Sequence, residues 1–307
     1  MFPEQLSLIE YLYHTYPFPF KKIFPEVFIM IFKSKNTDLN FVDGVGFLTF
    51  PPLSQLDFVH HAFSTRIGGI SAGEFKSMNL NFKRGDVSEN VTENYKIFCK
   101  AAGFDYSTLV SSSQDHHTNV RCITKADYGI GIYREHDMPS VDALVTNEPN
   151  VTLVTHYADC TPLFFADPEK KVIALAHAGW KGTVGKIGEA TVEVMTEQYG
   201  CDPSDIICVI GPAISFCCYE VDTPVYEQFA SLTELKPAYF TRNLGHGKYM
   251  IDLKETNRRM LLEAGLLSIN ISISDVCTKC NSGLLYSHRA SGGKRGGLVA
   301  MMRINEQ

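Results

Sequence analysis

Three residues of this 307-residue chain could hold a metal ion together: His116, Cys160 and His177. Cys160 lies where a predicted strand breaks, and His177 lies at the end of a second predicted strand that returns beside it. Because a hairpin brings such positions together, the two residues can be close in space. His116 lies in a polar turn before another predicted strand. Two imidazoles and one thiolate suit zinc with one position open to water, and they also suit copper.

Each of these residue types also has a common structural role. A cysteine in a strand is often a small buried side chain. A histidine at the end of a strand often serves only as a hydrogen-bonding group. Spacing alone therefore leaves both interpretations of the three residues open.

Several basic or polar residues are candidates for binding an anion. Lys181 lies in Gly179–Thr183, which precedes a predicted helix whose first N–H groups would face an anion. The other candidates lie in loops: Arg66, Asn79 and, in a glycine-rich basic segment, Arg289, Lys294 and Arg295. Turn formation and solvation explain these loop residues equally well.

Cys277 and Cys280 form a CxxC motif, which is half of a structural zinc site or a redox pair. The adjacent Cys217 and Cys218 could complete four ligands only if the fold brought both pairs together. Because neighbouring cysteines rarely bind one ion together, we do not expect such a site.

The middle of the chain predicts the elements that would position Cys160 and His177. We expect Leu163–Ala166 to resume the strand Val151–Thr155, and Val172–His177 to return beside it after a turn that contains Pro168. A helix is then expected from Gly179 to about Tyr199.

Hydrophobic periodicity and capping residues predict further elements elsewhere in the chain. Helices are expected at Glu89–Gly103 and at Asp252–Ala264, where Asp252 and Glu255 form a capping box. Further strands are expected at Val45–Phe50, Phe58–Phe63, Val120–Thr124, Ala143–Thr146, Ile206–Ile210, Ile269–Val276 and Leu298–Ile304. Strands and helices alternate irregularly, which indicates one mixed α/β domain over residues 41–307. Residues 1–40 form an N-terminal extension of unknown role.

Composition limits the class of partner. The net charge is -6 and no basic stripe is visible, so a nucleic-acid partner is not expected and small molecules fit better. The chain has nine cysteines and shows no N-terminal signal pattern, so we expect the thiols to be reduced. Apolar runs such as Val172–Ala176 are too short to span a bilayer. We therefore expect a cytoplasmic protein without a membrane partner.

Seven ordered motifs, over roughly residues 45–305, match one family. They are Ser64-Thr65-Arg66-x-Gly68-Gly69, Gln114-x-His116, Asp142–Thr146, Tyr157–Pro162, Ala176–Thr183, Ile210–Val221 and Asp275-x-Cys277-x-x-Cys280. The sequence resembles the laccase-domain proteins, also called polyphenol-oxidase-like purine nucleoside phosphorylases or peptidoglycan editing factors.

The resemblance implies a one-domain α/β fold like the catalytic domain of cytotoxic necrotising factor. It also implies zinc held by His116, Cys160 and His177. The implied substrates are purine nucleosides and phosphate, through phosphorolysis of adenosine, inosine, guanosine and methylthioadenosine and deamination of adenosine. Two places depart from the pattern of the family: His117 replaces a usual glycine, and the segment 287–295 lacks the usual acidic residue.

Roles follow for further residues under this hypothesis. Asp159 would move protons, and Arg66, Asn79, Lys181 and Arg289 would bind substrate or phosphate.

Three rival functions remain open. The first is a copper-dependent polyphenol oxidase with copper in the His₂Cys site; a multicopper oxidase would need many histidine ligands, and the chain has no His-x-His pair. A hydrolase would use Cys160 as nucleophile and His177 as base. A cell-wall editing factor would act on a peptidoglycan precursor.

Overall fold

The computed structural model describes residues 34–306, which form two six-stranded mixed sheets and one three-stranded sheet. The first sheet has the order β1 (Asp38–Val42), β2 (Val45–Thr49), β3 (Val59–Ser64), β15 (Leu298–Ile304), β7 (Thr152–Tyr157) and β4 (Leu109–Ser111). The second has the order β14 (Ile271–Ile273), β10 (Ile207–Ile210), β8 (Thr161–Asp167), β9 (Val172–Ala178), β6 (Ala143–Thr146) and β5 (Val120–Cys122). The third consists of β11 (Glu220–Asp222), β13 (Lys248–Ile251) and β12 (Thr241–Gly245).

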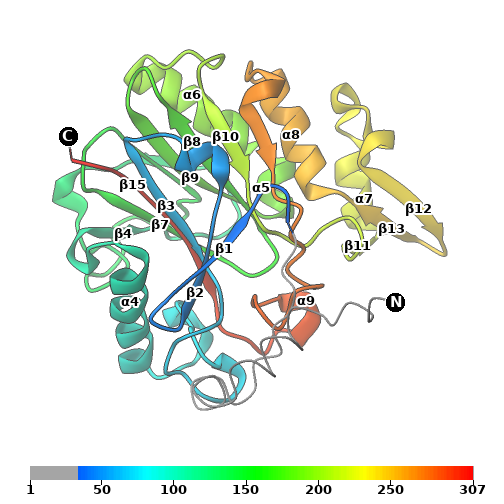
Figure 1. Ribbon diagram of the computed structural model, residues 1–307. Helices are drawn as coiled ribbons and strands as arrows, with labels where there is room; N and C mark the ends of the chain where they lie inside the picture. The colour runs from blue at the N-terminus through cyan, green and yellow to red at the C-terminus, as the bar shows by residue number, and fades with distance from the viewer. Residues whose placement is uncertain (1–33, 307) are drawn as a thin grey trace, which may run out of the picture. The chain divides into compact units, whose positions relative to one another are not determined.

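Helices cover the outer faces of the two large sheets, which pack on each other through β7, β15 and β9 (Figure 1). The helices are α3 (Pro51–Ser54), α4 (Ser88–Ala102), α5 (Trp180–Val184), α6 (Ile187–Tyr199), α7 (Thr223–Ala230), α8 (Leu253–Glu263) and α9 (His288–Ser291). Helix α4 packs on the first sheet, whereas α6 and α8 pack on the second. No helix in the described part of the chain is long and apolar enough to cross a membrane.

The central strands β8 and β9 are buried along their whole length, because each faces helices on one side and the other sheet on the other. Leu163 and Phe165 belong to the core beneath α6 and α8. Phe164, between them, points the opposite way and meets the ring of Phe50 at a centroid distance of 5.1 Å. This alternation explains why the strand has no polar face.

The prediction that Leu163–Ala166 resumes the strand Val151–Thr155 is wrong. β7 belongs to the first sheet and β8 to the second, so the chain crosses between sheets at residues 158–160. Asp159 takes a positive φ of 84° at this crossing, which bends the backbone out of the first sheet. The hairpin itself is confirmed, since β8 and β9 pair antiparallel with Pro162 opposite His177.

The expected helix from Gly179 to Tyr199 is also wrong in one respect, because it is two helices. Lys186 takes a φ of 66° between α5 and α6, a left-handed conformation that no α-helix continues through. The strand expected at Ile269–Val276 is confirmed only over Ile271–Ile273. At the other end of the chain, β1 includes Asp38–Asn40, so this part of the predicted extension pairs with β2; residues 1–33 lie outside the described residues.

Candidate metal centre and its cavity

The fold brings His116, Cys160 and His177 together, as the sequence predicts. His116 lies in the turn after β4, Cys160 at the crossing between the sheets, and His177 near the end of β9. One ligand atom from each residue lies within 4.8 Å of the other two. Cys160 Sγ is 3.9 Å from His116 Nε2, and the two imidazole rings are 4.9 Å apart between centroids.

Asp142, just before β6, holds two of these residues in place. Its carboxylate accepts hydrogen bonds from the backbone N–H groups of Asp115, His116 and His117 at 3.2, 3.1 and 3.0 Å. It also lies 2.8 Å from His177 Nδ1, which leaves Nε2 of that ring free to bind a metal. The sequence interpretation missed this role. The available signal was the position of this aspartate between the apolar residues Val141 and Ala143, which indicates burial. A buried carboxylate must be paired.

The three residues also change one another's charge state. Burial opposes ionisation of the Cys160 thiol, but His177 and His116 outweigh it and lower the pKa of Cys160 to about 6. Burial likewise opposes the charge on His177, yet Cys160 and Asp142 raise the pKa of His177 to about 9. The cluster thus pairs a thiolate with an imidazolium. A bound zinc ion would keep the thiolate as a ligand and take the place of the imidazolium proton.

Gly179 provides the space that the cluster needs. A β-carbon at this position would lie 2.7 Å from His116 Cδ2 and 3.1 Å from Cys160 Sγ. The first distance is shorter than real contacts allow, so any side chain here would displace His116.

The three residues line a cavity of about 790 Å³, including its open mouth. The same wall includes Lys83, Arg84 and Arg295, with the rings of Phe82 and Tyr157. Lys83 and Arg84 come from a short 3-10 turn, and Arg295 comes from the segment before β15. The sequence interpretation missed Lys83 and Arg84 because no motif marks that turn.

Arg295 is a half-buried cation with an unused donor. Its Nε is buried and has no hydrogen-bond partner among the described residues, whereas its Nη1 donates to the Gly296 carbonyl at 2.8 Å. Burial and the positive charge of Arg84 lower the pKa of Arg295 to about 10. An anion in the cavity would accept hydrogen bonds from the guanidinium group of Arg295 and reduce its repulsion with that of Arg84.

The four residues predicted to bind substrate or phosphate are placed elsewhere; none is among the described residues that line this cavity. Arg66 donates to the carbonyls of Lys76 and Ser282 and stacks on Tyr286. Asn79 is fully buried and accepts hydrogen bonds from the N–H groups of Asn81 and Gly297. Lys181 is exposed, 5.7 Å from the Trp180 ring, and Arg289 donates to the Glu220 carbonyl.

Asp159, the predicted proton carrier, has both carboxylate oxygens in hydrogen bonds. Thr278 donates its hydroxyl to one oxygen, and the backbone N–H of Arg289 donates to the other at 2.7 Å. Its contacts are those of a residue that fixes loops next to Cys160.

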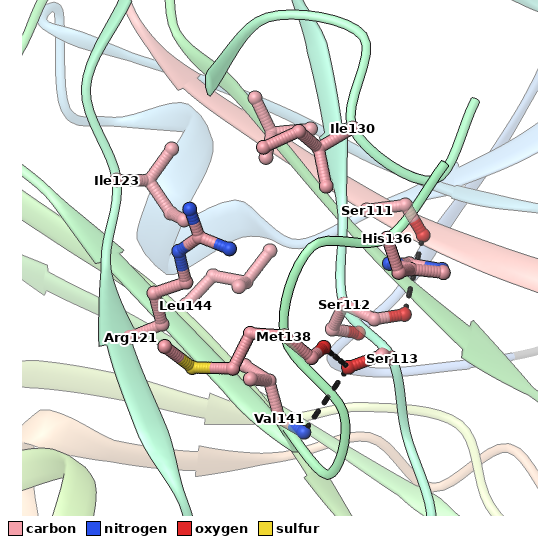
Figure 2. A pocket seen from close by; sticks show the side chains of 11 residues that line it. Ser111, Ser112, Ser113, Arg121, Ile123, Ile130, His136, Met138, Val141 and Leu144 are labelled. Atoms are coloured by element: carbon pink, nitrogen blue, oxygen red, sulfur yellow. Dashed lines mark hydrogen bonds between the residues drawn. The ribbon is translucent and has the colours of Figure 1, made fainter. Parts of the chain in front are cut away.

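A smaller pocket shares His136 with the cavity (Figure 2). Its cation, Arg121, is paired with Asp127 and Asp137. The pocket holds neither Cys160 nor His177, and its Ser113 hydroxyl donates to the Met138 carbonyl, so we assign the chemistry to the larger cavity.

The fold and site thus define a mixed α/β protein with a candidate His/Cys metal centre at a cationic cavity. Residues 60–305 match the family described as multi-copper polyphenol oxidoreductase laccase, and the chain belongs to this family. It is 38% identical over 245 residues to the purine nucleoside phosphorylase YlmD of Bacillus subtilis (strain 168), and the match covers 80% of this chain and 88% of that protein.

Solved structures agree with this assignment. The fold is similar to that of the hypothetical protein YfiH of Bacillus licheniformis, with a TM-score of 0.82 and 32% identity over 86% of this chain and 98% of that one. It is also similar to YlmD from Geobacillus stearothermophilus, with a TM-score of 0.79 and 34% identity over 87% of this chain and 98% of that one.

Proposed function

We propose that this protein is a zinc-dependent purine nucleoside phosphorylase that acts on adenosine, inosine, guanosine and methylthioadenosine. The observation that carries the proposal is the shared wall of one cavity, which includes His116, Cys160 and His177 together with the cation Arg295. Relatives named purine nucleoside phosphorylase support it, because they match most of the chain.

The three donors fit zinc. Two imidazole nitrogens and one thiolate are ligands that zinc accepts, and three protein ligands leave the open position of a catalytic site. The hydrogen bond between Asp142 and His177 Nδ1 fixes the tautomer that presents Nε2. When bound, a zinc ion would supply a Lewis acid at this end of the cavity.

Phosphate would bind to Arg295, with Arg84 and Lys83 adding positive charge. Held there, one phosphate oxygen would attack C1′ of the ribose while the bond from C1′ to the purine breaks. The products are ribose 1-phosphate and the free base. These three cations replace Arg66, Asn79, Lys181 and Arg289 in our assignment of phosphate ligands.

The departing purine ends with the proton that the attacking hydrogenphosphate gives up, and a hydrogen bond can stabilise the base as it leaves. His136 lines the cavity, and its ring has no hydrogen bond to another described residue, unlike His156 and His177. Burial lowers the pKa of His136, so the neutral ring would donate an N–H to the base. We assign this role to His136 rather than to Asp159, whose oxygens are both engaged.

Deamination of adenosine is a second candidate for the same cavity. A His/Cys donor set on the wall of a pocket is the feature that favours it, since nucleobase deaminases hold zinc with histidine and cysteine. This reaction would need no phosphate and would yield inosine.

The test is an assay of metal-analysed protein with adenosine, with and without phosphate, in which adenine and inosine are separated by chromatography. We expect phosphate-dependent adenine that increases with zinc content. Arg295→Gln should raise the KM for phosphate on the order of 10-fold or more, because it removes a charged hydrogen bond. The rate of any inosine formation should change far less in this variant than the KM for phosphate does. Lys294→Gln, at the exposed neighbouring residue, is the matched control.

Other outcomes point to the rivals. Zinc-loaded protein that forms neither product contradicts the proposal. Alkylation of Cys160 that zinc fails to prevent would favour the hydrolase, and phenol oxidation only after copper loading would favour the oxidase. Aberrant peptidoglycan precursors in a deletion strain with unchanged purines would favour the cell-wall role.

A further inference from the structure

A second cluster of metal-binding residues lies at the edge of the second sheet, formed by Cys217, Cys218, Cys277 and Cys280. The expectation that the fold leaves these two pairs apart is wrong. β10 and β14 pair parallel, so the loops after their carboxyl ends meet at the same edge. Ala213 bridges to Cys277, and the Thr278 N–H donates to the Ala213 carbonyl at 3.1 Å.

The sulfur positions fit one tetrahedral ion. All four Sγ atoms lie within 4.8 Å of one another. Cys217 is 3.6 Å from Cys218 and 3.7 Å from Cys280, and Cys218 is 3.5 Å from Cys280. Four sulfurs around zinc, each at about 2.3 Å, would be about 3.8 Å apart in tetrahedral geometry. A disulfide would need about 2.0 Å, and all four cysteines are free.

Neighbouring groups favour negative charge at this position. The Ser215 N–H points at Cys277 Sγ from 3.4 Å, an arrangement that stabilises a bound thiolate. Lys254 is buried, and its ammonium group donates to the carbonyls of Ser274 and Val276 at 2.8 Å each. The hydrogen bonds hold this ammonium group just before Cys277, where the carboxylates of Asp252 and Asp275 also act on its charge.

We propose that Cys217, Cys218, Cys277 and Cys280 bind one thiophilic divalent ion of the zinc class, in a second and closed site. Binding of one Zn²⁺ to four thiols releases four protons and leaves a net charge of −2, which the buried Lys254 partly balances. Four protein ligands leave no open position, so this ion has a structural role.

The site joins two loops that lead to the candidate metal centre. The Ile214 N–H donates to the Asp159 carbonyl at 2.9 Å, and the Thr278 hydroxyl donates to the Asp159 carboxylate. Asp159 directly precedes Cys160. The second ion would therefore fix the backbone that positions Cys160, whatever reaction takes place there.

Metal content tests the proposal independently of activity. Reduced wild-type protein loaded with zinc should hold two ions per chain. His116→Ala/Cys160→Ala should retain one, and its cobalt(II) form should show the intense ligand-field absorption of a tetrahedral thiolate site. Cys217→Ser/Cys280→Ser should hold one ion and lack the four-thiolate absorption. Cys122→Ser, at an exposed cysteine outside both clusters, should still hold two.

Wild-type protein provides a measurement that does not depend on folding of a variant. A strong chelator should release zinc and expose four additional thiols to a thiol reagent for each ion of the second site. The proposal fails if His116→Ala/Cys160→Ala, still folded by circular dichroism, binds no zinc or cobalt. It also fails if two of the four cysteines form a disulfide in freshly reduced, zinc-loaded protein.

Discussion

The two cysteine-containing clusters of this protein differ in what surrounds them. His116, Cys160 and His177 open into a cavity that also contains Arg295. The four-cysteine cluster lies between two loops, and none of its members is among the residues that line that cavity. The first cluster depends on Asp142, which orients His177, whereas the second is supported by the backbone N–H of Ser215.

This difference shows how the surroundings of a metal site decide whether the ion has a catalytic or a structural role. Three ligands beside a cavity leave room for a reacting group, but four ligands between loops do not. Asp159 links the two clusters, because it accepts a hydrogen bond from Thr278 on one side and precedes Cys160 on the other. Changes at the first cluster should therefore act on turnover directly, whereas changes at the second should lower stability and affect turnover through the position of Cys160.

The largest expected effect comes from Cys160→Ala. Loss of the thiolate removes a ligand and the negative charge that faces His177, so kcat/KM for adenosine phosphorolysis should fall on the order of 1,000-fold. The cobalt(II) thiolate absorption of the four-cysteine site should be unchanged. A variant that keeps full turnover would remove the first cluster from the mechanism.

Asp142→Asn should have the next largest effect. The amide can still accept a hydrogen bond, but it no longer fixes the His177 tautomer with a negative charge. Zinc affinity at the first cluster should fall about 10- to 100-fold, the usual cost of losing such a partner. Competition with a chromogenic chelator measures this, and zinc at the four-cysteine site provides the internal control. Equal weakening of both sites would indicate that Asp142 acts only through general stability.

The sequence predicts the individual strands and helices better than it predicts how they are connected. Ala143–Thr146 and Leu298–Ile304 are observed with the predicted bounds, because apolar runs between turns mark buried strands. The same signal cannot tell which sheet a buried strand joins, so the crossing at Asp159 was missed. The break at Lys186 was missed too, because a lysine with positive φ leaves no mark in the apolar period.

The site was predicted unevenly for a similar reason. His116, Cys160 and His177 were predicted as a ligand set through the resemblance to the laccase-domain proteins, because spacing alone leaves their common structural roles open. Lys83 and Arg84 were not, since surface cations occur throughout the chain and only the fold selects which ones reach a cavity. The four-cysteine cluster could be predicted only by knowing that β10 and β14 are parallel neighbours. These segments are far apart in sequence, and no local pattern reveals their pairing.

The smallest expected effect is that of replacing His117, the residue that follows His116 in sequence. His116 belongs to the cluster, but His117 is exposed and lies beside Asp115 Oδ1 at 2.7 Å and Ser140 Oγ at 2.9 Å. Because exposed pairs contribute little, His117→Ala should change kcat/KM by less than about twofold. His116→Ala should lose nearly as much activity as Cys160→Ala. Parallel assays with zinc analysis compare the two, and a large loss in His117→Ala would mean that the metal centre extends to the exposed side of this turn.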